Sequence, residues 1–245
     1  MTHKALWLAV AASMFVACSA TTPRTDAELS QAAKQGDGRA QYELAKRLAN
    51  QPDYPNAMHW MQQAAEQSGP LAADQQTRAT AAWQVGDWYQ VGLGEPKNPA
   101  LANQWWQRSA RLGNTNASYR LGLVCQEQHQ GKLASNCLDW FEQAAKRDHA
   151  DAQLVLVRWY SKQPGADADA IKWLEKAAEL GNRDAQHLLD ERYAQGQGVA
   201  KRPDIALRWN DKAAAQQQPD ALLLQAKQAA PADAFRAYQR AANAG

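Results

Sequence analysis

The residues of this chain that could carry out chemistry are few and scattered. His187 and Glu191 stand four residues apart, a spacing that places two side chains on one face of a helix. A pair at this spacing is far more often a surface interaction than a metal site. Asp167 and Asp169 lack the further oxygen ligands that a calcium loop supplies at regular spacing, so we expect them to begin a helix. The sequence predicts neither a catalytic centre nor a metal site.

Established catalytic, metal-binding and nucleotide-binding motifs are missing from the sequence as well. It contains no Gly-x-Ser-x-Gly elbow, no His-Glu-x-x-His motif and no Walker loop. The Gly-x-Gly triplets at 92–94 and 196–198 occupy corresponding points of a repeated pattern, which indicates turns. We therefore expect a non-enzymatic protein without a cofactor, and an enzyme with an unrecognised site is the least favoured alternative.

The N-terminal residues predict export. A short basic start precedes an apolar run at 5–16, which is too short to span a bilayer as a mature helix. Residues 15–18, Phe-Val-Ala-Cys, resemble the bacterial lipobox. That resemblance implies a signal peptide at 1–17, a lipidated Cys18 and a polar tether at 18–26. Ser19, where an Asp would imply retention at the inner membrane, implies a periplasm-facing outer-membrane lipoprotein. The alternative is cleavage near Ala20, with Cys18 discarded.

Cys125 and Cys137 are the remaining cysteines. In an exported protein two such cysteines are more often paired than free, so we expect a disulfide between consecutive helices. Two free thiols are the alternative. A zinc site is less favoured, since two cysteines without a close pair of histidines supply too few ligands.

The charge balance excludes one class of partner. The formal net charge is +2, and it falls to +1 once Lys4 is removed with the signal. Basic and acidic residues are interspersed along the chain, so there is no extended field to attract nucleic acid or anionic lipid. A nucleic-acid partner is therefore not expected.

A repeated pattern defines the elements that carry these residues. A pair of small residues, Ala-Ala in six places and Ser109-Ala110 in one, recurs seven times at intervals of 28 to 45 residues, and five of these pairs follow a Trp by four residues. A recurrence near 34 residues that tolerates insertions is typical of stacked helix pairs. Small residues allow the helices to approach closely, and we expect the Trp to fill the wedge between pairs. The five Trp are Trp60, Trp105, Trp140, Trp173 and Trp209.

The repeat has a recognisable consensus. Its residues follow the pattern A-x-x-x-L-G-x-x-Y-x-x-G-x-G-V and then K-A-x-x-W-x-x-K-A-A-x-x-G, most closely at 185–214. This pattern resembles the Sel1-like repeat, a relative of the tetratricopeptide repeat. The resemblance implies an all-α fold, a right-handed α/α solenoid over 27–245 with about five repeats and a shortened C-terminal helix pair. It also implies a scaffold or adaptor that binds other proteins.

The same resemblance places a partner on the first helix of each pair, whose side chains line the concave groove. Tyr42 and Tyr119 have packing as an equal alternative, and the additional Trp88, Trp106 and Trp159 are expected to pack in the core or at its rim. Because Trp and Tyr also stack on sugar rings, carbohydrate is the alternative ligand to a protein of the cell envelope. The expected contact residues are Tyr42, Lys46, Trp83, Asp87, Tyr119, Leu123, Arg158, His187 and Glu191.

Overall fold

The computed structural model describes residues 24–216, 223, 226–227, 238–239 and 242–243, and this part of the chain forms eleven α-helices. The helices are α1 (Asp26–Lys34), α2 (Gly38–Asn50), α3 (Tyr54–Glu66), α4 (Gln75–Val91), α5 (Pro99–Arg111), α6 (Thr115–Gln128), α7 (Ser135–Ala145), α8 (Ala150–Tyr160), α9 (Asp167–Glu179), α10 (Arg183–Gln195) and α11 (Pro203–Ala215).

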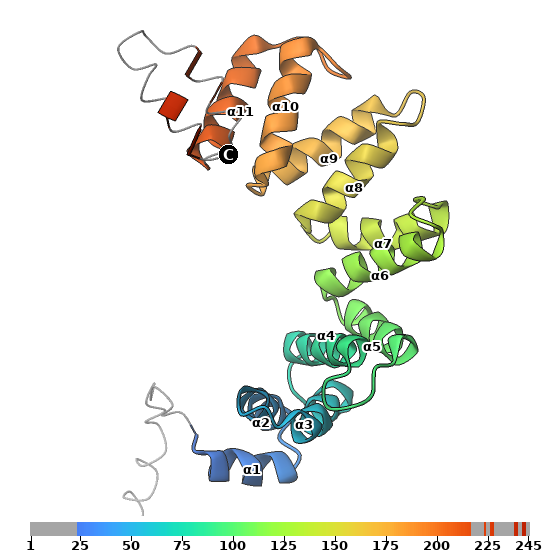
Figure 1. Cartoon of the computed structure of the whole chain (residues 1–245), viewed down its shortest axis with the longest axis vertical. Helices are drawn as coiled ribbons and strands as arrows, with labels where there is room; N and C mark the ends of the chain where they lie inside the picture. The colour runs from blue at the N-terminus through green and yellow to red at the C-terminus, as the bar shows by residue number, and fades with distance from the viewer. Residues whose placement is uncertain (1–23, 217–222, 224–225, 228–237, 240–241, 244–245) are drawn as a thin grey trace, which may run out of the picture.

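Each helix packs mainly against the helices before and after it, as expected of a solenoid. The pairs α2–α3, α4–α5, α6–α7, α8–α9 and α10–α11 stack in chain order into a curved array (Figure 1). The turns from α5 to α6, α7 to α8 and α9 to α10 face the hollow of the curve, whereas the α6–α7 and α8–α9 connections lie on the opposite edge. The predicted all-α solenoid is confirmed.

The helix ends follow from local chemistry. Side chains of Asp74, Asn114 and Asn182 each accept a hydrogen bond from the backbone three residues on, which satisfies a helix N-terminal N–H group. Gly92 and Gly196 end α4 and α10 in the left-handed conformation that glycine adopts without strain. The connections are therefore specified locally, and stacking sets only how the pairs lie on one another.

The residues that form the wedge between the helices are not the ones predicted. The five repeated Trp are only half-buried, and in each second helix the next residue is buried instead. Because helical side chains advance by 100° per residue, a shift of one position turns a different side chain into the core. Cations partly cover three repeated Trp, with Lys212 Nζ closest, 4.0 Å from the Trp209 ring centroid. The buried residues are Met61, Trp106, Phe141, Leu174 and Asn210, all at most 2% exposed.

The size of each buried wedge residue is complementary to that of the residue at one position on the first helix of its own pair. That position holds Gly86 against Trp106 and Gly122 against Phe141, so the largest wedges meet residues without a side chain. The smaller wedges Met61 and Leu174 share a core cluster with Ala45 and Val157, respectively. Volume is thus conserved within each pair, as close packing requires.

Buried glutamines connect successive pairs, and sequence reasoning did not identify them. Gln41, Gln153 and Gln186 each donate from Nε2 to the carbonyl of the second alanine in the preceding Ala-Ala pair, at 3.0 to 3.1 Å. A buried amide without a partner would be costly, so these bonds favour one stacking register. The signal for them is a Gln eight residues after the second alanine.

The N-terminal end is tied to the array by ion pairs. Thr25 and Glu28 form a capping box at the start of α1. Arg24 pairs with Asp37 at 2.9 Å, and Asp26 pairs with Arg47 on α2. The predicted signal, Cys18 and most of the tether lie outside the described residues, as does most of the expected C-terminal helix pair. Among the residues described, no helix has the length and apolarity needed to cross a membrane.

Candidate partner-binding surface

The residues predicted to contact a partner lie on the first helices of all five pairs. Two groups of them meet further residues of neighbouring helices, one across α4, α5 and α6 and one across α6, α7 and the start of α8. The members at the two ends of the array make local contacts instead. Lys46 Nζ lies 5.4 Å from the Tyr42 ring centroid on α2, and His187 lies 3.9 Å from Glu191 on α10.

The first group combines two indoles with one acidic and one basic side chain. The ring centroids of Trp83 and Trp106 are 6.0 Å apart, and the Trp106 indole Nε1–H donates to Asp87 Oδ1 at 3.1 Å. The Arg120 guanidinium lies 5.1 Å from the Trp106 ring centroid. Burial raises the pKa of Asp87, against the opposing effects of the indole hydrogen bond and the Arg120 charge. These contacts hold an acid and a base beside a half-buried Trp83.

The second group is built on Tyr119. Its ring stacks on His149 with centroids 4.6 Å apart and meets Phe141 edge to face at 5.7 Å. Burial raises the pKa of the Tyr119 hydroxyl, the Asp151 charge raises it further, and the Arg158 charge opposes both. Burial also lowers the pKa of His149, so its imidazole is neutral at pH 7. The arrangement offers aromatic faces beside a carboxylate.

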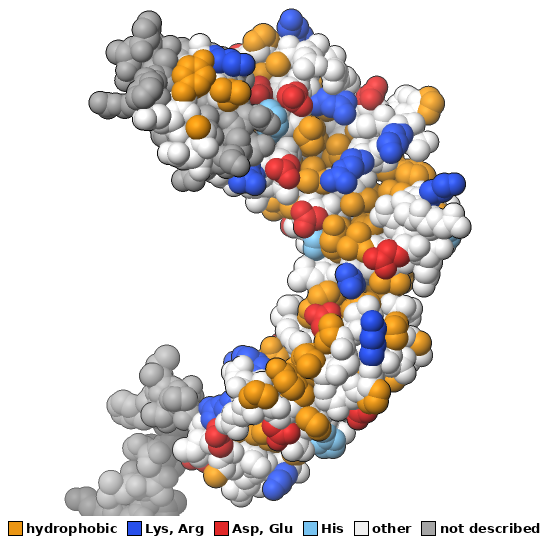
Figure 2. Space-filling view, viewed as in Figure 1, with side chains coloured by type: hydrophobic (Ala, Val, Ile, Leu, Met, Phe, Trp, Pro, Cys, Tyr) orange, Lys and Arg blue, Asp and Glu red, His pale blue; other side chains and the backbone are white. Residues whose placement is uncertain are grey.

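We call the surface formed by these groups the inner surface. Figure 2 shows hydrophobic side chains interspersed with acidic and basic ones along the hollow of the molecule. Such a mixture of aromatic anchors and surrounding charges is typical of protein interfaces. The inner surface comprises Trp83, Asp87, Tyr119, Arg120, His149 and Asp151.

The remaining predicted residues differ in accessibility. Leu123 is half-buried against the core of the third pair, and Leu154, at the corresponding groove position of α8, is buried. Arg158 is exposed and lies at the edge of the array, where it lines a cavity with Lys132 and Lys162. Sequence reasoning missed Arg120, His149 and Asp151, because their proximity to the predicted residues depends on how neighbouring pairs stack.

A buried polar pair replaces the apolar wedge in the last described helix pair. Asn210 Nδ2 donates to Asp190 Oδ2 at 3.5 Å, and both residues are at most 5% exposed. Burial is the main cause that raises the pKa of Asp190, and Glu191 raises it further. Asn210 and His187 lower it. Ionised Asp190 is therefore less favourable in the folded protein than in the unfolded chain.

This pair predicts a pH-dependent contribution to stability. An acid whose pKa is raised on folding binds more protons in the folded state, so its contribution declines as pH rises from about 4, the value for an unfolded Asp, through the folded pKa. We expect Asp190→Asn to reduce this decline and to be more stable than the parent protein at pH 7. Chemical unfolding of both proteins between pH 4 and 7 measures how their free energies of unfolding change with pH. Parallel pH profiles would contradict this assignment.

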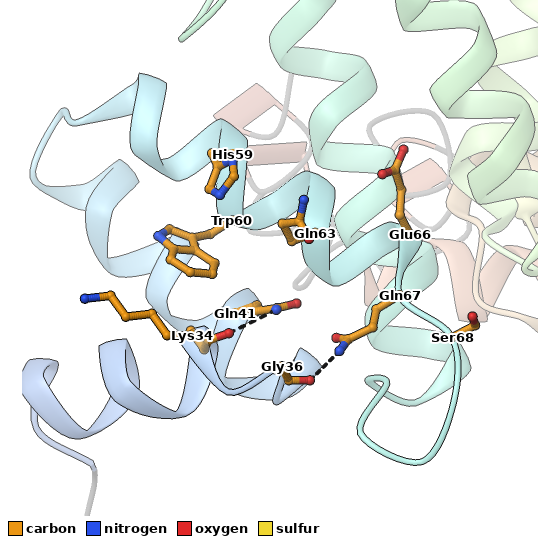
Figure 3. Close-up of a pocket in the computed structure, with 10 residues that line it drawn as sticks. Lys34, Gly36, Gln41, His59, Trp60, Gln63, Glu66, Gln67 and Ser68 are labelled. Atoms are coloured by element: carbon orange, nitrogen blue, oxygen red, sulfur yellow. Dashed lines mark hydrogen bonds between the residues drawn. The ribbon is translucent and has the colours of Figure 1, made fainter.

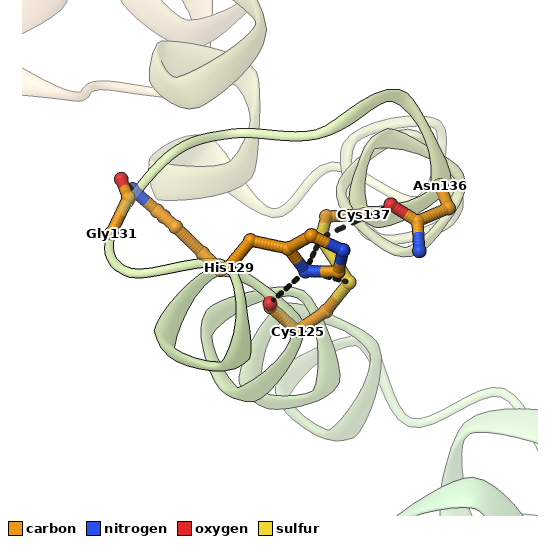
Figure 4. The surroundings of a disulfide bond; sticks show 6 residues. Cys125, His129, Gly131, Asn136 and Cys137 are labelled. Carbon is orange, nitrogen blue, oxygen red and sulfur yellow. Dashed lines mark hydrogen bonds between the residues drawn. A yellow bond between two sulfur atoms is a disulfide. The ribbon is translucent and has the colours of Figure 1, made fainter.

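The disulfide lies beside a histidine. Cys125 near the end of α6 and Cys137 in α7 are bonded, with Cα atoms 5.5 Å apart (Figure 4). The Nδ1 atom of His129 is 3.7 Å from Cys137 Sγ and 2.8 Å from the Cys125 carbonyl oxygen. Ligand atoms of these three residues lie within 4.8 Å of one another, but the disulfide removes both thiolates. In this state the cluster is a cross-link, because a single imidazole does not make a zinc site.

A second concave region lies at the N-terminal end, between α1 and α3. Gln41 and Gln67 donate to the carbonyls of Ala33 and Gly36 (Figure 3). Trp60 and His59 line a groove of about 600 Å³ with them, and Lys34 and Glu66 supply charges of both signs. Since its hydrogen bonds join α1 to the first pair, we interpret this groove as a joint of the array.

A family model described as Sel1 repeat matches residues 38–69, 79–114, 115–149, 167–182 and 184–217, more than half of the chain. The chain belongs to the Sel1 repeat family. Four of the matched segments contain most or all of a helix pair, whereas α8 lies outside them. Sel1 repeat proteins act generally as scaffolds for protein–protein interactions and are typically not catalytic.

Solved structures support the same assignment. A Sel1 repeat protein from Oxalobacter formigenes is 27% identical, with a TM-score of 0.61, and the match covers 84% of this chain and 83% of that one. The protein c5321, a protective antigen of uropathogenic Escherichia coli with an SLR fold, is 22% identical, with a TM-score of 0.50. That match covers 90% of this chain and 56% of the c5321 chain. No curated protein matches the sequence significantly.

Proposed function

We propose that this Sel1 repeat protein is a non-enzymatic adaptor of the bacterial cell envelope and binds a protein partner on its inner surface. The observation that carries the proposal is that two half-buried aromatic rings, Trp83 and Tyr119, lie near acidic and basic groups of α4, α6 and α8. Aromatic and Arg side chains contribute most of the energy in protein interfaces, since they bury large areas and retain polar contacts.

The N-terminal motif gives the proposal its location. A lipidated Cys18 would anchor the array to the outer membrane through several acyl chains, which stable anchoring requires. The array would then face the periplasm and hold its partner near the membrane, in an envelope complex or an exopolysaccharide export assembly. The expected disulfide belongs to the same oxidising compartment.

Alanine substitutions on the inner surface test the proposal. We expect Trp83→Ala and Tyr119→Ala, each combined with Arg120→Ala, to reduce the partner recovered with the affinity-purified protein from envelopes at least tenfold, about 1.4 kcal/mol. Matched controls are Gln104→Ala and Lys172→Ala, which change exposed residues on second helices. Circular dichroism checks that helicity is retained. If folded inner-surface variants recovered as much partner as the controls, the partner would bind elsewhere.

A further inference from the structure

A cavity of about 490 Å³ lies at the edge of the array opposite the hollow, between the α6–α7 and α8–α9 connections. Its volume falls in the range of sites that bind small ligands or single side chains. Trp159 on α8 is half-buried in it, and no described residue accepts a hydrogen bond from its indole N–H. The lining residues are Gln126, Gly131, Lys132, Leu133, Val155, Arg158, Trp159, Lys162 and Gln163.

The cavity exists because a covering side chain is missing. Trp159 and Trp88 occupy the same position of the repeat, two residues after the position that faces the wedge. Trp88 is only 6% exposed, since Tyr54 from the preceding pair meets it edge to face at 6.4 Å. Six residues before the repeated Trp, where the first pair has Tyr54, the third pair has Ala134. A methyl group therefore replaces a phenol beside Trp159.

The turn after α8 also leaves Trp159 uncovered. In the second pair Gly94 packs on the Tyr54 backbone at the start of α3, and Leu93 joins the core. Gly198 packs on the Asp167 side chain at the start of α9. The shorter turn after α8 has no Gly-x-Gly triplet, and Gly165 has no neighbouring atom within 4 Å of an added Cβ. Two independent departures from the repeat thus leave Trp159 accessible.

The charge of the cavity is one-sided. Lys132, Arg158 and Lys162 line it together with no Asp or Glu, and none of the three forms an ion pair within the described part of the chain. Three other surface cavities each include a carboxylate, Glu66 in two of them and Asp184 in the third. A negatively charged ligand would therefore be complementary to this cavity.

We propose that this cavity binds an acidic peptide segment that carries one aromatic or large aliphatic side chain. The apolar side chain packs on Trp159 between Val155 and Leu133, and flanking Asp or Glu side chains pair with Lys132, Arg158 and Lys162. A neutral sugar fits less well, because its hydroxyl groups need acceptors. The cavity has no carboxylate, and its charged groups, Lys132, Arg158 and Lys162, only donate hydrogen bonds.

This inference rests on the proposed protein-binding function and names the chemistry of one anchor of the partner. The probe is a fluorescein-labelled peptide, Glu-Asp-Glu-Phe-Asp-Glu, titrated with the full chain and followed by fluorescence anisotropy. We expect saturable binding that weakens as salt rises, because salt screens the ion pairs. The same peptide with Lys in place of every acidic residue should not bind.

Two variants test the site itself. Ala134→Tyr adds the ring that covers Trp88 in the second pair, so it should weaken peptide binding at least tenfold without removing a charge. The combination of Lys132→Gln and Lys162→Gln should weaken it as much while leaving the cavity open. Lys97→Gln, at an exposed lysine in the α4–α5 connection, is the matched control and should bind like the parent protein. Thermal unfolding checks that each variant is folded.

Three results would overturn the inference: unchanged peptide binding by folded Ala134→Tyr, equal binding of the Lys peptide, or binding of oligogalacturonate but not of the peptide. The proposed function is tested separately. If the acidic peptide fails to bind while inner-surface variants still lose the partner, only the cavity assignment is wrong. If the peptide binds and inner-surface variants keep the partner, only the inner surface is wrong.

Discussion

Alanine at Gly86 is expected to destabilise the protein by about 1–3 kcal/mol, the usual cost of overpacking a core. In an ordinary helix the same change would be stabilising, since Gly is about 1 kcal/mol worse than Ala. Here an added Cβ would lie 2.5 Å from Trp106 Cδ1 and 3.2 Å from the Ala102 carbonyl oxygen. Trp106 is 1% exposed, so its ring has little room to move aside.

A second substitution separates steric conflict from a general loss of stability. Gly86→Ala with Trp106→Met reproduces the Ala45–Met61 pairing of the first repeat. We expect the double variant to be more stable than the sum of the two single changes predicts, with a coupling energy of about 1–3 kcal/mol. Urea unfolding of all four proteins gives this value. Additive effects would show that the two positions do not determine each other.

Removal of the disulfide has the other large expected effect. Cys125→Ala with Cys137→Ala should lower the free energy of unfolding by about 3 kcal/mol, because a short loop of the unfolded chain is no longer closed. Alanine is preferred to serine, since Cys137 is fully buried and a hydroxyl group there would need a partner. Thermal unfolding of the parent and double variant, each with and without reductant, measures the effect.

The control for this prediction is the reductant. It should destabilise the parent protein toward the level of the double variant and leave the double variant unchanged. Equal stability of the oxidised parent and the double variant would mean that α6 and α7 are held together by packing alone.

The fold was predictable because its information is local and repeated. The repeated Trp and the pair of small residues that follows it mark a point in each of the five helix pairs, Gly-x-Gly turns mark two of them, and the helices begin and end near these points. The wedge was assigned one residue too early, to Trp105 instead of Trp106 in the second pair. A conspicuous Trp suggests burial, but only the contact with Gly86 shows which of the two adjacent indoles enters the core.

The site was less predictable, since it depends on how pairs stack. The sequence predicted Trp83, Asp87 and Tyr119 from their helical position, but Arg120 and His149 approach them only through the packing of successive pairs. The cavity at Trp159 arises from absences at Ala134 and in the turn after α8. Both absences can be read from the sequence, but only the structure shows that they leave the same Trp accessible.

The central claim is that the inner surface binds a protein. A photo-crosslinking amino acid placed at Trp83, at Tyr119 and, as controls, at the exposed positions Gln104 and Lys172 tests it in bacterial cells that make the protein. We predict that both inner-surface positions yield the same protein adduct, identified by mass spectrometry, and that neither control position does. Adducts at the control positions with none at Trp83 and Tyr119 would contradict the account.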